Sequence, residues 1–327
     1  MDKTTNNKSL IISVMRAVAV LSIVSAHVDA VIDDYSSRLL RNFATGGVAV
    51  FFVISGYLFF YNKRGIIDFF KRKFSTIFIP WLFTGTITFL YTEIRHLGIG
   101  GLSIISYLKW IFGIKTYLWY MTVLVALYIL FLLFAKYRAF LIVMPIIAII
   151  SFATNKFTYP FLYQWGGNYL NVFNWSLFFE AGYIINKFDI ITKINKYLKL
   201  KIFISFILLY FVVLFLLSFS HQLSYNIPLY LPYCVLYIIA VFSFAQLFKN
   251  SSFILKIGEH SFSIYLLHMP IAGIISAVGK ILNIWIFTIL SPFIAIIIVE
   301  LFIYIFEKII DLLKLNKSKF NLLIGLR

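Results

Sequence analysis

An arginine and a histidine interrupt the first long apolar run of the sequence. Arg16 and His27 lie within the segment 10–30, separated by ten residues. This spacing in an α-helix makes three turns plus about 20° and a rise of about 16 Å, so both side chains would leave one face at two depths. A guanidinium group binds phosphate through its planar fork, and a neutral imidazole accepts a proton from a hydroxyl group. The spacing alone leaves two interpretations open: a catalytic pair, or polar residues that pair with other groups and hold a helix bundle together.

The composition indicates an integral membrane protein. Of the 327 residues, 62% are hydrophobic and 13% are charged, and the mean hydropathy is +0.94. Soluble proteins are about half apolar and about a quarter charged. A net charge of +17 would suit nucleic-acid binding in a soluble protein, but here the basic residues stand in short clusters between apolar runs, as orientation signals do. We therefore expect membrane lipid, and no nucleic acid, as a partner.

Continuous apolar runs predict an all-α bundle of about ten transmembrane helices, since a helix of roughly 20 residues spans a bilayer. The alternating pattern of barrel strands is not seen. We expect a single transmembrane domain over residues 1–327. The predicted spans are 10–30, 45–62, 76–93, 117–135, 139–153, 168–186, 202–220, 228–247, 259–279 and 286–306.

The distribution of basic residues predicts the orientation. With a cytoplasmic N-terminus and ten spans, the inner segments hold roughly three times as many Lys and Arg residues as the outer ones. We expect a protein of the bacterial cytoplasmic (inner) membrane with both termini in the cytoplasm. The outer segment 94–116 contains an apolar stretch typical of an interfacial or re-entrant helix. The tail that begins at Glu307 has the pattern of an amphipathic helix on the inner surface.

Several titratable residues fall inside the predicted spans, where a charge costs about 2.5–3.5 kcal/mol on insertion scales and marks a functional candidate. An ion pair of Arg16 with Glu300 or Glu180 is the structural alternative. Neither a zinc-ligand pattern nor a Walker-type phosphate loop occurs, so we expect no metal. The residues inside the spans are Arg16, His27, Asp29, Glu180, His268 and Glu300.

Five segments, in order along the chain, resemble the acyltransferase-3 family of membrane acyltransferases. The first is the arginine, ten residues and histidine formed by Arg16 and His27. The resemblance extends over nearly the whole chain. The other segments are "GGVAVFFVISGYLFF" at 46–60, "FFKRKFSTIFIPWL" at 69–82 (the family's basic cytoplasmic loop and the start of its third helix), "YLWYMTVLVALY" at 117–128 and "IGEHSFSIYLLHMPI" at 257–271.

The resemblance implies an O-acyltransferase of the stand-alone type. Such enzymes move an acyl group, often acetyl from acetyl-CoA, to a hydroxyl of a sugar in a lipid-linked or cell-surface glycan. His27 is then expected to deprotonate the acceptor hydroxyl or to become transiently acylated. Arg16 is expected to bind the phosphates of the acyl-CoA donor or to orient its thioester. The acceptor sugar, the acyl chain and the oligomeric state are not indicated by the sequence.

Other residues in the matching segments are secondary candidates. Lys71, Arg72 and Lys73 would bind coenzyme A phosphates, although basic residues at such a place also contact anionic lipid. Trp119 and Tyr120 would contact substrate or belong to an interfacial aromatic belt.

Four residues of the last two spans complete the candidates. His268 would contact substrate or pack in the bundle, and Glu300 would contact substrate or act as a counter-ion. Glu259 and His260 are expected at a helix start, as capping or interfacial residues.

A second interpretation belongs to another functional class. Ten spans with buried arginine, histidine and glutamate residues also suit a transporter or exporter of polysaccharide or small molecules. The spacing of Arg16 and His27 and the basic segment 69–82 favour the acyltransferase. A glycan polymerase would share the many spans but usually has larger outer loops.

Overall fold

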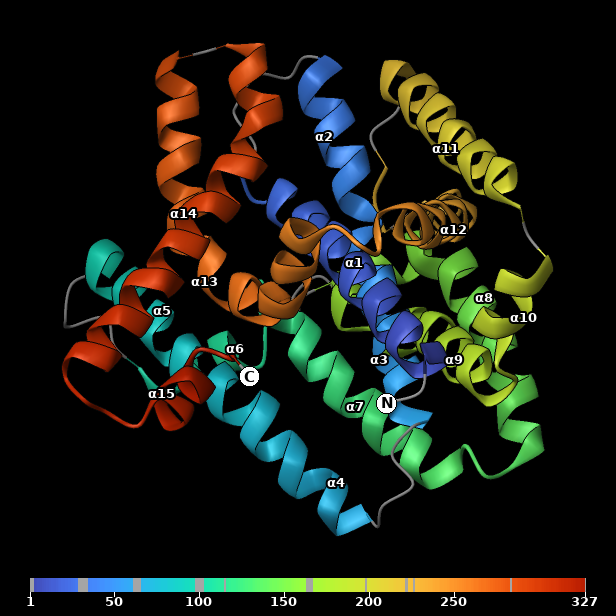
Figure 1. The fold of residues 1–327 in the computed structure, drawn as a ribbon, viewed down its shortest axis with the longest axis horizontal. Helices are drawn as coiled ribbons and strands as arrows, with labels where there is room; N and C mark the ends of the chain where they lie inside the picture. The colour runs from blue at the N-terminus through green and yellow to red at the C-terminus, as the bar shows by residue number, and fades with distance from the viewer. Residues whose placement is uncertain are drawn as a thin grey trace.

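The computed structural model consists of helices joined by short connections (Figure 1). It describes residues 3–28, 35–60, 66–97, 103–114, 116–162, 167–197, 199–220, 223–225, 227–282 and 284–326, and no β-strand occurs within these ranges. The expected all-α fold is therefore confirmed. The helical elements are α1 (Lys3–Ser25), α2 (Tyr35–Thr45), α3 (Gly47–Phe60), α4 (Ile66–Lys73), the π-helical turn η1 (Phe74–Phe78), α5 (Ile79–Leu97), α6 (Ile104–Ile111), α7 (Trp119–Phe134), α8 (Arg138–Leu162), the 3-10 turn η4 (Gly167–Leu170), α9 (Val172–Lys187), α10 (Ile190–Tyr197), α11 (Leu200–Ser220), α12 (Tyr230–Phe248), α13 (Ser252–Leu282), α14 (Trp285–Leu312) and α15 (Lys317–Leu323).

The helices are long and apolar enough for a multi-pass membrane protein. In the described part of the chain, 8 helical segments could cross a membrane by length and composition. The predicted fourth and sixth spans are the shorter helices α7 and α9, of 16 residues each. Each of the predicted apolar runs thus coincides with a helix. The expected short helix in the segment 94–116 is α6, which Ser103 caps by accepting a hydrogen bond from the Ile105 amide.

The second span begins at Tyr35 rather than at residue 45. The sequence did not predict this earlier start, because α2 carries polar residues that interrupt the apolar run. Asn42 is buried. Its Nδ2 donates to Ser218 Oγ at 3.0 Å, and its Oδ1 accepts from the Leu223 amide at 2.8 Å. Polar groups at membrane depth are tolerated when they are paired in this way. The pairing also joins α2 to the end of α11.

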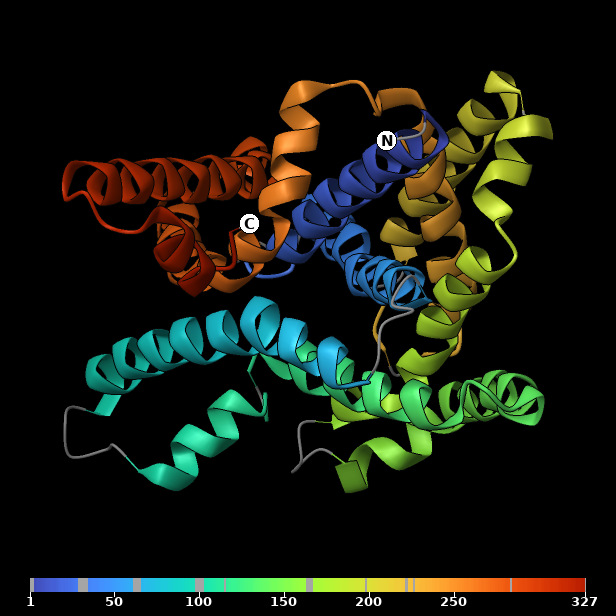
Figure 2. The same ribbon diagram turned by 60° about the horizontal axis from the view of Figure 1, so that its bottom comes forward.

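The basic segment is helical, which corrects the expectation of a loop before the span predicted to begin at residue 76. α4, η1 and α5 follow one another without a break from Ile66 to Leu97, as the cyan rod in Figure 2 shows. The Ser75 and Thr76 hydroxyls donate to the Arg72 carbonyl at 3.0 and 2.8 Å where the π-helical turn begins. The three basic residues stand in the last turn of α4, so helix geometry decides which of them faces the bundle.

α1 lies in the middle of the molecule, between α13 and α14 on one side and α3 and α12 on the other (Figures 1 and 2). Glycines allow the closest approaches. A Cβ at Gly258 of α13 would overlap the Ser13 carbonyl of α1. A Cβ at Gly56 of α3 would overlap the Phe179 carbonyl of α9, and one at Gly182 would overlap the Val53 carbonyl. Small residues at helix contacts are typical of membrane bundles, where close packing replaces the hydrophobic effect.

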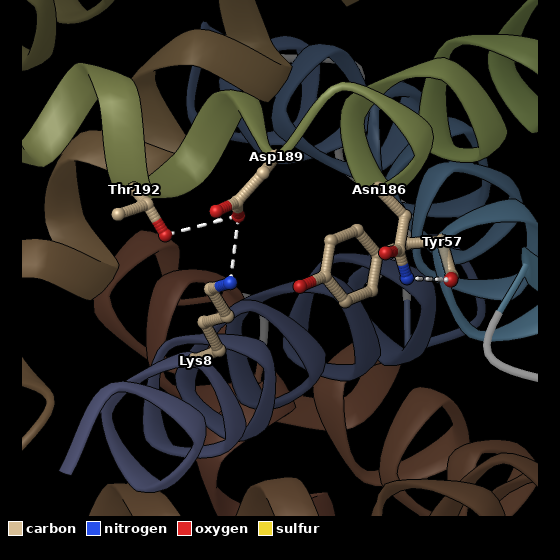
Figure 3. Close-up of polar contacts among 5 residues, drawn as sticks. All are labelled: Lys8, Tyr57, Asn186, Asp189 and Thr192. Carbon is tan, nitrogen blue, oxygen red and sulfur yellow. Dashed lines mark hydrogen bonds and ion pairs between the residues drawn. The ribbon is translucent and has the colours of Figure 1, made fainter. Parts of the chain in front are cut away.

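Polar contacts tie the start of α1 to the turn between α9 and α10 (Figure 3). Lys8 Nζ donates to Asp189 Oδ1 at 2.6 Å, and Thr192 Oγ1 donates to the same oxygen at 2.9 Å. The hydrogen bond from Lys8 is the main cause that lowers the pKa of Asp189 below its ordinary value. Nearby, Asn186 Nδ2 donates to the Tyr57 carbonyl at 2.6 Å and joins α9 to α3.

The C-terminal tail is not one helix: residues 307–312 continue α14, the short helix α15 follows, and the residues after α15 turn back into the protein. Ile324 and Leu326 are 3% and 6% exposed. Gly325 has a φ of 81°, in the left-handed region that favours glycine, and a Cβ there would press on the Phe262 ring of α13. The end of the tail is thus packed against the bundle, which an amphipathic pattern alone does not predict.

Candidate active site

A small cavity opens beside Arg16. It has a volume of about 260 Å³, and Arg16 and Lys73 both line it. Lys73 Nζ donates to the Tyr128 hydroxyl at 3.0 Å and lies 4.7 Å from the centre of that ring, so its ammonium group is held toward the bundle. The carboxyl-bearing Glu259 is also in the wall. A cavity with two cations at its wall suits an anionic ligand, with Arg16 offering a planar fork and Lys73 a point charge.

A larger cavity opens beside His27. Its volume is about 700 Å³, within the range of roughly 300–1,000 Å³ typical of small-molecule sites. His27 is half-buried at its wall. Most of the other side chains are aromatic, and tyrosine and tryptophan combine large apolar faces with a polar group. The aromatic residues in the wall are Trp110, Tyr117, Trp119, Tyr120, Tyr169, Tyr225 and Tyr265.

Two tyrosines belong to the walls of both cavities. Tyr120 and Tyr265 line the cavity beside Arg16 and also the cavity beside His27. Their rings meet edge to face, with centroids 5.7 Å apart, and the Tyr120 hydroxyl is 3.1 Å from Ser55 Oγ. The cavities are thus neighbours along one face of α1, as the spacing of Arg16 and His27 predicts.

α1 ends at Ser25, before the predicted end at residue 30, so His27 lies in the turn after the helix. The turn continues the helical path, because the His27 amide donates to the Val24 carbonyl at 3.0 Å. The Ser276 hydroxyl of α13 is 3.5 Å from the His27 carbonyl. His27 therefore follows α1 in a further helical turn, and its backbone contacts α13. Asp29 lies outside the described residues.

Reciprocal hydrogen bonds fix the aromatic wall to α13. The Tyr117 hydroxyl donates to the Leu266 carbonyl at 3.1 Å, and the Tyr265 hydroxyl donates to the Tyr117 carbonyl at 2.6 Å. Gly113, with a φ of 75°, makes the tight turn between α6 and α7, where a Cβ would overlap the backbone of Trp119. Only glycine adopts this conformation freely. The turn places Tyr117 and Trp119 at the cavity.

The three basic residues of α4 do not share one environment. Lys73 lines the cavity beside Arg16, whereas Lys71 and Arg72 are exposed. Trp119 lines the cavity beside His27, and Tyr120 is 6% exposed between the two cavities. Both aromatic residues therefore face the interior of the protein.

His268 is fully buried behind His27, with ring centroids 5.1 Å apart. Glu300 lies outside both cavity walls, and its Oε2 is 2.9 Å from His260 Nδ1. The expectation that Glu259 and His260 start a helix is wrong, because α13 begins at Ser252. The earlier start places Glu259 at the cavity beside Arg16.

Glu180 is a separate buried group. It is 1% exposed, and neither carboxylate oxygen has a hydrogen-bond partner among the residues that the structure describes. It belongs to neither cavity wall. Within the same described ranges, no group of three or more histidine, cysteine, aspartate or glutamate residues is placed to hold a metal ion.

Several tyrosines of the site were not among the sequence candidates, including Tyr117 and Tyr265. Tyr265 stands three residues before His268 in the segment 257–271, and this helical spacing puts the two residues on neighbouring positions of one face. That was a usable signal. Tyr117 starts the segment 117–128, but its role depends on contacts with α13 that the local sequence does not show.

A comparison with known protein families identifies the family of the chain. A family model described as an acyltransferase domain, that of the acyltransferase-3 family, matches residues 10–307. No curated protein and no solved structure gave a match. The matched region begins in α1 before Arg16 and ends within α14, so it includes every lining residue of the cavity beside His27 and all but Gly325 of the cavity beside Arg16. The chain therefore belongs to the acyltransferase-3 family, as its sequence segments predicted, and is a multi-pass membrane protein of an acyl-transfer class.

Proposed function

We propose that the protein is a membrane O-acyltransferase that moves an acyl group, most simply acetyl, from acyl-CoA to a sugar hydroxyl. One observation carries the proposal: two adjacent cavities lie along one face of α1, one with Arg16 in its wall and one with His27. A transfer enzyme needs separate sites for a charged donor and a hydroxyl-bearing acceptor, with a base where they meet.

The donor binds on the side of Arg16. A volume of about 260 Å³ holds only part of a coenzyme A, so the pantetheine arm and a phosphate would enter while the nucleotide stays at the mouth. Arg16 and Lys73 would contact phosphate oxygens there. Lys71 and Arg72, exposed on the same helix end as Lys73, would face the nucleotide or anionic lipid. The rise of about 16 Å from Arg16 to His27 is comparable with an extended pantetheine arm.

His27 acts at the acceptor hydroxyl. A lone pair of its neutral imidazole takes the hydroxyl proton while the hydroxyl oxygen attacks the thioester carbonyl. The carbon–sulfur bond then breaks, and the proton held by His27 passes to the leaving thiolate. The products are the acyl ester and free coenzyme A, so atoms and charge balance. Attack by a His27 nitrogen itself, giving a transient acyl-imidazole, is the alternative course.

The acceptor is a glycan. The cavity beside His27 is wide, and its wall of tyrosine and tryptophan rings offers flat apolar faces and hydroxyl groups, which suit the apolar faces and polar edges of a sugar. A lipid-linked or cell-surface glycan would reach it from the membrane. The protein would lie in a bacterial inner membrane, and the bias of basic residues supports an orientation with both termini and the donor side in the cytoplasm.

The test uses [14C]acetyl-CoA and membrane vesicles of the source cells, which carry their own glycans. Base-labile label on the glycan is measured with wild-type protein and with His27→Ala. We expect label that depends on acetyl-CoA and a loss on the order of 100-fold or more in the variant. His260→Asn is the matched control, because His260 contacts Glu300 and lines neither cavity. No transfer by wild type, or unimpaired transfer by His27→Ala, would refute the proposal, and glycan export without acetyl-CoA turnover would favour a transporter.

A further inference from the structure

His268 has one ring nitrogen whose role the reaction above does not explain. Its Nδ1 lies 2.6 Å from the Tyr265 carbonyl. A carbonyl oxygen only accepts hydrogen bonds, so Nδ1 must carry the proton. In the neutral ring, the lone pair is then on Nε2. That atom is buried and has no hydrogen-bond partner among the described residues. A buried acceptor without a partner is unusual and calls for a functional explanation.

Among the ring contacts of His268, the one with His27 has the shortest separation of centroids. The two imidazole centroids are 5.1 Å apart, with the rings tilted by 50°. At this separation, nitrogen atoms on facing edges come within hydrogen-bonding distance when one ring turns. His27 is half-buried in the wall of a cavity and has room to turn. The His268 ring has no such room, because it is 0% exposed.

The surroundings of His268 hold it in place. The Tyr117 ring packs edge-on against it at 5.5 Å, and the Tyr265 ring lies 6.0 Å away. The reciprocal hydrogen bonds between these tyrosines and the backbone fix α13 beside the turn that carries Tyr117. The Nε2 lone pair of His268 therefore keeps a fixed direction, and the ring of His27 is the one that turns toward it.

We propose that His268 is a positioning residue for His27. Its buried Nε2 accepts a hydrogen bond from one ring N–H of His27, which leaves the lone pair of the other His27 nitrogen directed at the acceptor cavity. A buried acceptor behind a histidine base fixes its tautomer and direction, as the aspartate does in the serine protease triad. Here the acceptor is a neutral imidazole. The inference rests on the proposed role of His27 as the base.

A pair of substitutions separates this role from a structural one. In His268→Asn, the side-chain amide reproduces the Nδ1 donor to the Tyr265 carbonyl and leaves nothing at the place of Nε2. In His268→Gln, the amide reaches the place of Nε2 and can accept a hydrogen bond there, but the donor at Nδ1 is lost. A structural role predicts that Asn is the better substitute. The positioning role predicts the opposite order.

The experiment measures kcat and the KM for acetyl-CoA in the vesicle assay for both variants. We expect His268→Asn to lower kcat on the order of 100-fold with KM little changed, and His268→Gln to remain within about tenfold of wild type. Activity of His268→Asn equal to or above that of His268→Gln would overturn the inference, as would a loss confined to KM. If His27→Ala is inactive while His268→Asn is fully active, only this inference fails; if wild type transfers nothing, the proposed function itself fails.

A spectroscopic measurement does not depend on turnover. The 15N shifts of labelled histidine ring nitrogens distinguish the tautomers, and the chain has 5 histidines that single variants can assign. We expect one dominant tautomer of His27 in wild type and in His268→Gln, and a mixture in His268→Asn. An unchanged His27 signal in His268→Asn, with an intact elution profile of the purified protein, would contradict the hydrogen bond.

Discussion

Replacement of Arg16 by glutamine is predicted to weaken acyl-CoA binding through the donor's phosphates. Arg16 is half-buried in the wall of a cavity of about 260 Å³ that Lys73 also lines. A hydrogen bond to a charged group contributes about 1.5–3 kcal/mol, and each 1.4 kcal/mol changes affinity about tenfold. Loss of the contact should therefore raise the KM for acetyl-CoA by about 10- to 150-fold. The contact is made equally in the ground and transition states, so kcat should change little.

The assay compares acetyl-CoA with S-acetyl-pantetheine, a donor that carries the same thioester but no phosphate. Release of free coenzyme A or pantetheine thiol is followed in membrane vesicles with their own glycan acceptors. The penalty of Arg16→Gln should appear with acetyl-CoA and vanish with S-acetyl-pantetheine. Lys256→Gln is the control, because Lys256 is an exposed cation of α13 that lines neither cavity. Equal losses with both donors would refute the phosphate contact and place Arg16 at the thioester or in a structural pair.

Two further predictions concern the packing that holds the site. Lys8 lowers the pKa of Asp189, so their ion pair stabilises the fold above the ordinary carboxyl pKa of about 4 and is lost as the pH falls through the lowered pKa. The deficit in Tm of Asp189→Asn should be small, because the Asp189 side chain is 53% exposed, and should shrink from pH 6 toward about pH 3; a deficit that grows on acidification would contradict this sign. Gly56→Ala and Gly182→Ala should each destabilise the protein by about 1–3 kcal/mol through overlap with the facing backbone. Gly273→Ala is the control and should be neutral or stabilising, because a Cβ added there would meet no atom outside its own helix turn within 4 Å. Equal losses of Tm in all three variants would count against the close packing of α3 on α9.

The apolar helices were predictable because the bilayer imposes a minimum length on them. The common face of Arg16 and His27 was predictable because helical periodicity is local. Boundaries were less predictable where polar residues are paired inside the protein. α2 precedes the predicted start of the second span, and its Asn42 is paired with α11 and with the segment after α11. A count of apolar residues does not detect such a pairing.

The contacts that shape the site depend on tertiary packing. His27 and His268 lie 241 positions apart and meet only because α1 packs against α13. The contact between His260 and Glu300 depends in the same way on α13 and α14. The basic segment shows three cations in a row, but only the helical geometry of α4 distinguishes Lys73, at the cavity, from its exposed neighbours.

The most direct test of the account is a single-turnover measurement with His27→Ala at saturating [14C]acetyl-CoA. Because the donor site beside Arg16 remains intact, donor binding should persist while ester formation on the glycan falls on the order of 100-fold or more. His260→Asn should form ester at the wild-type rate. Ester formation by His27→Ala at the wild-type rate would contradict the central claim that His27 performs the transfer.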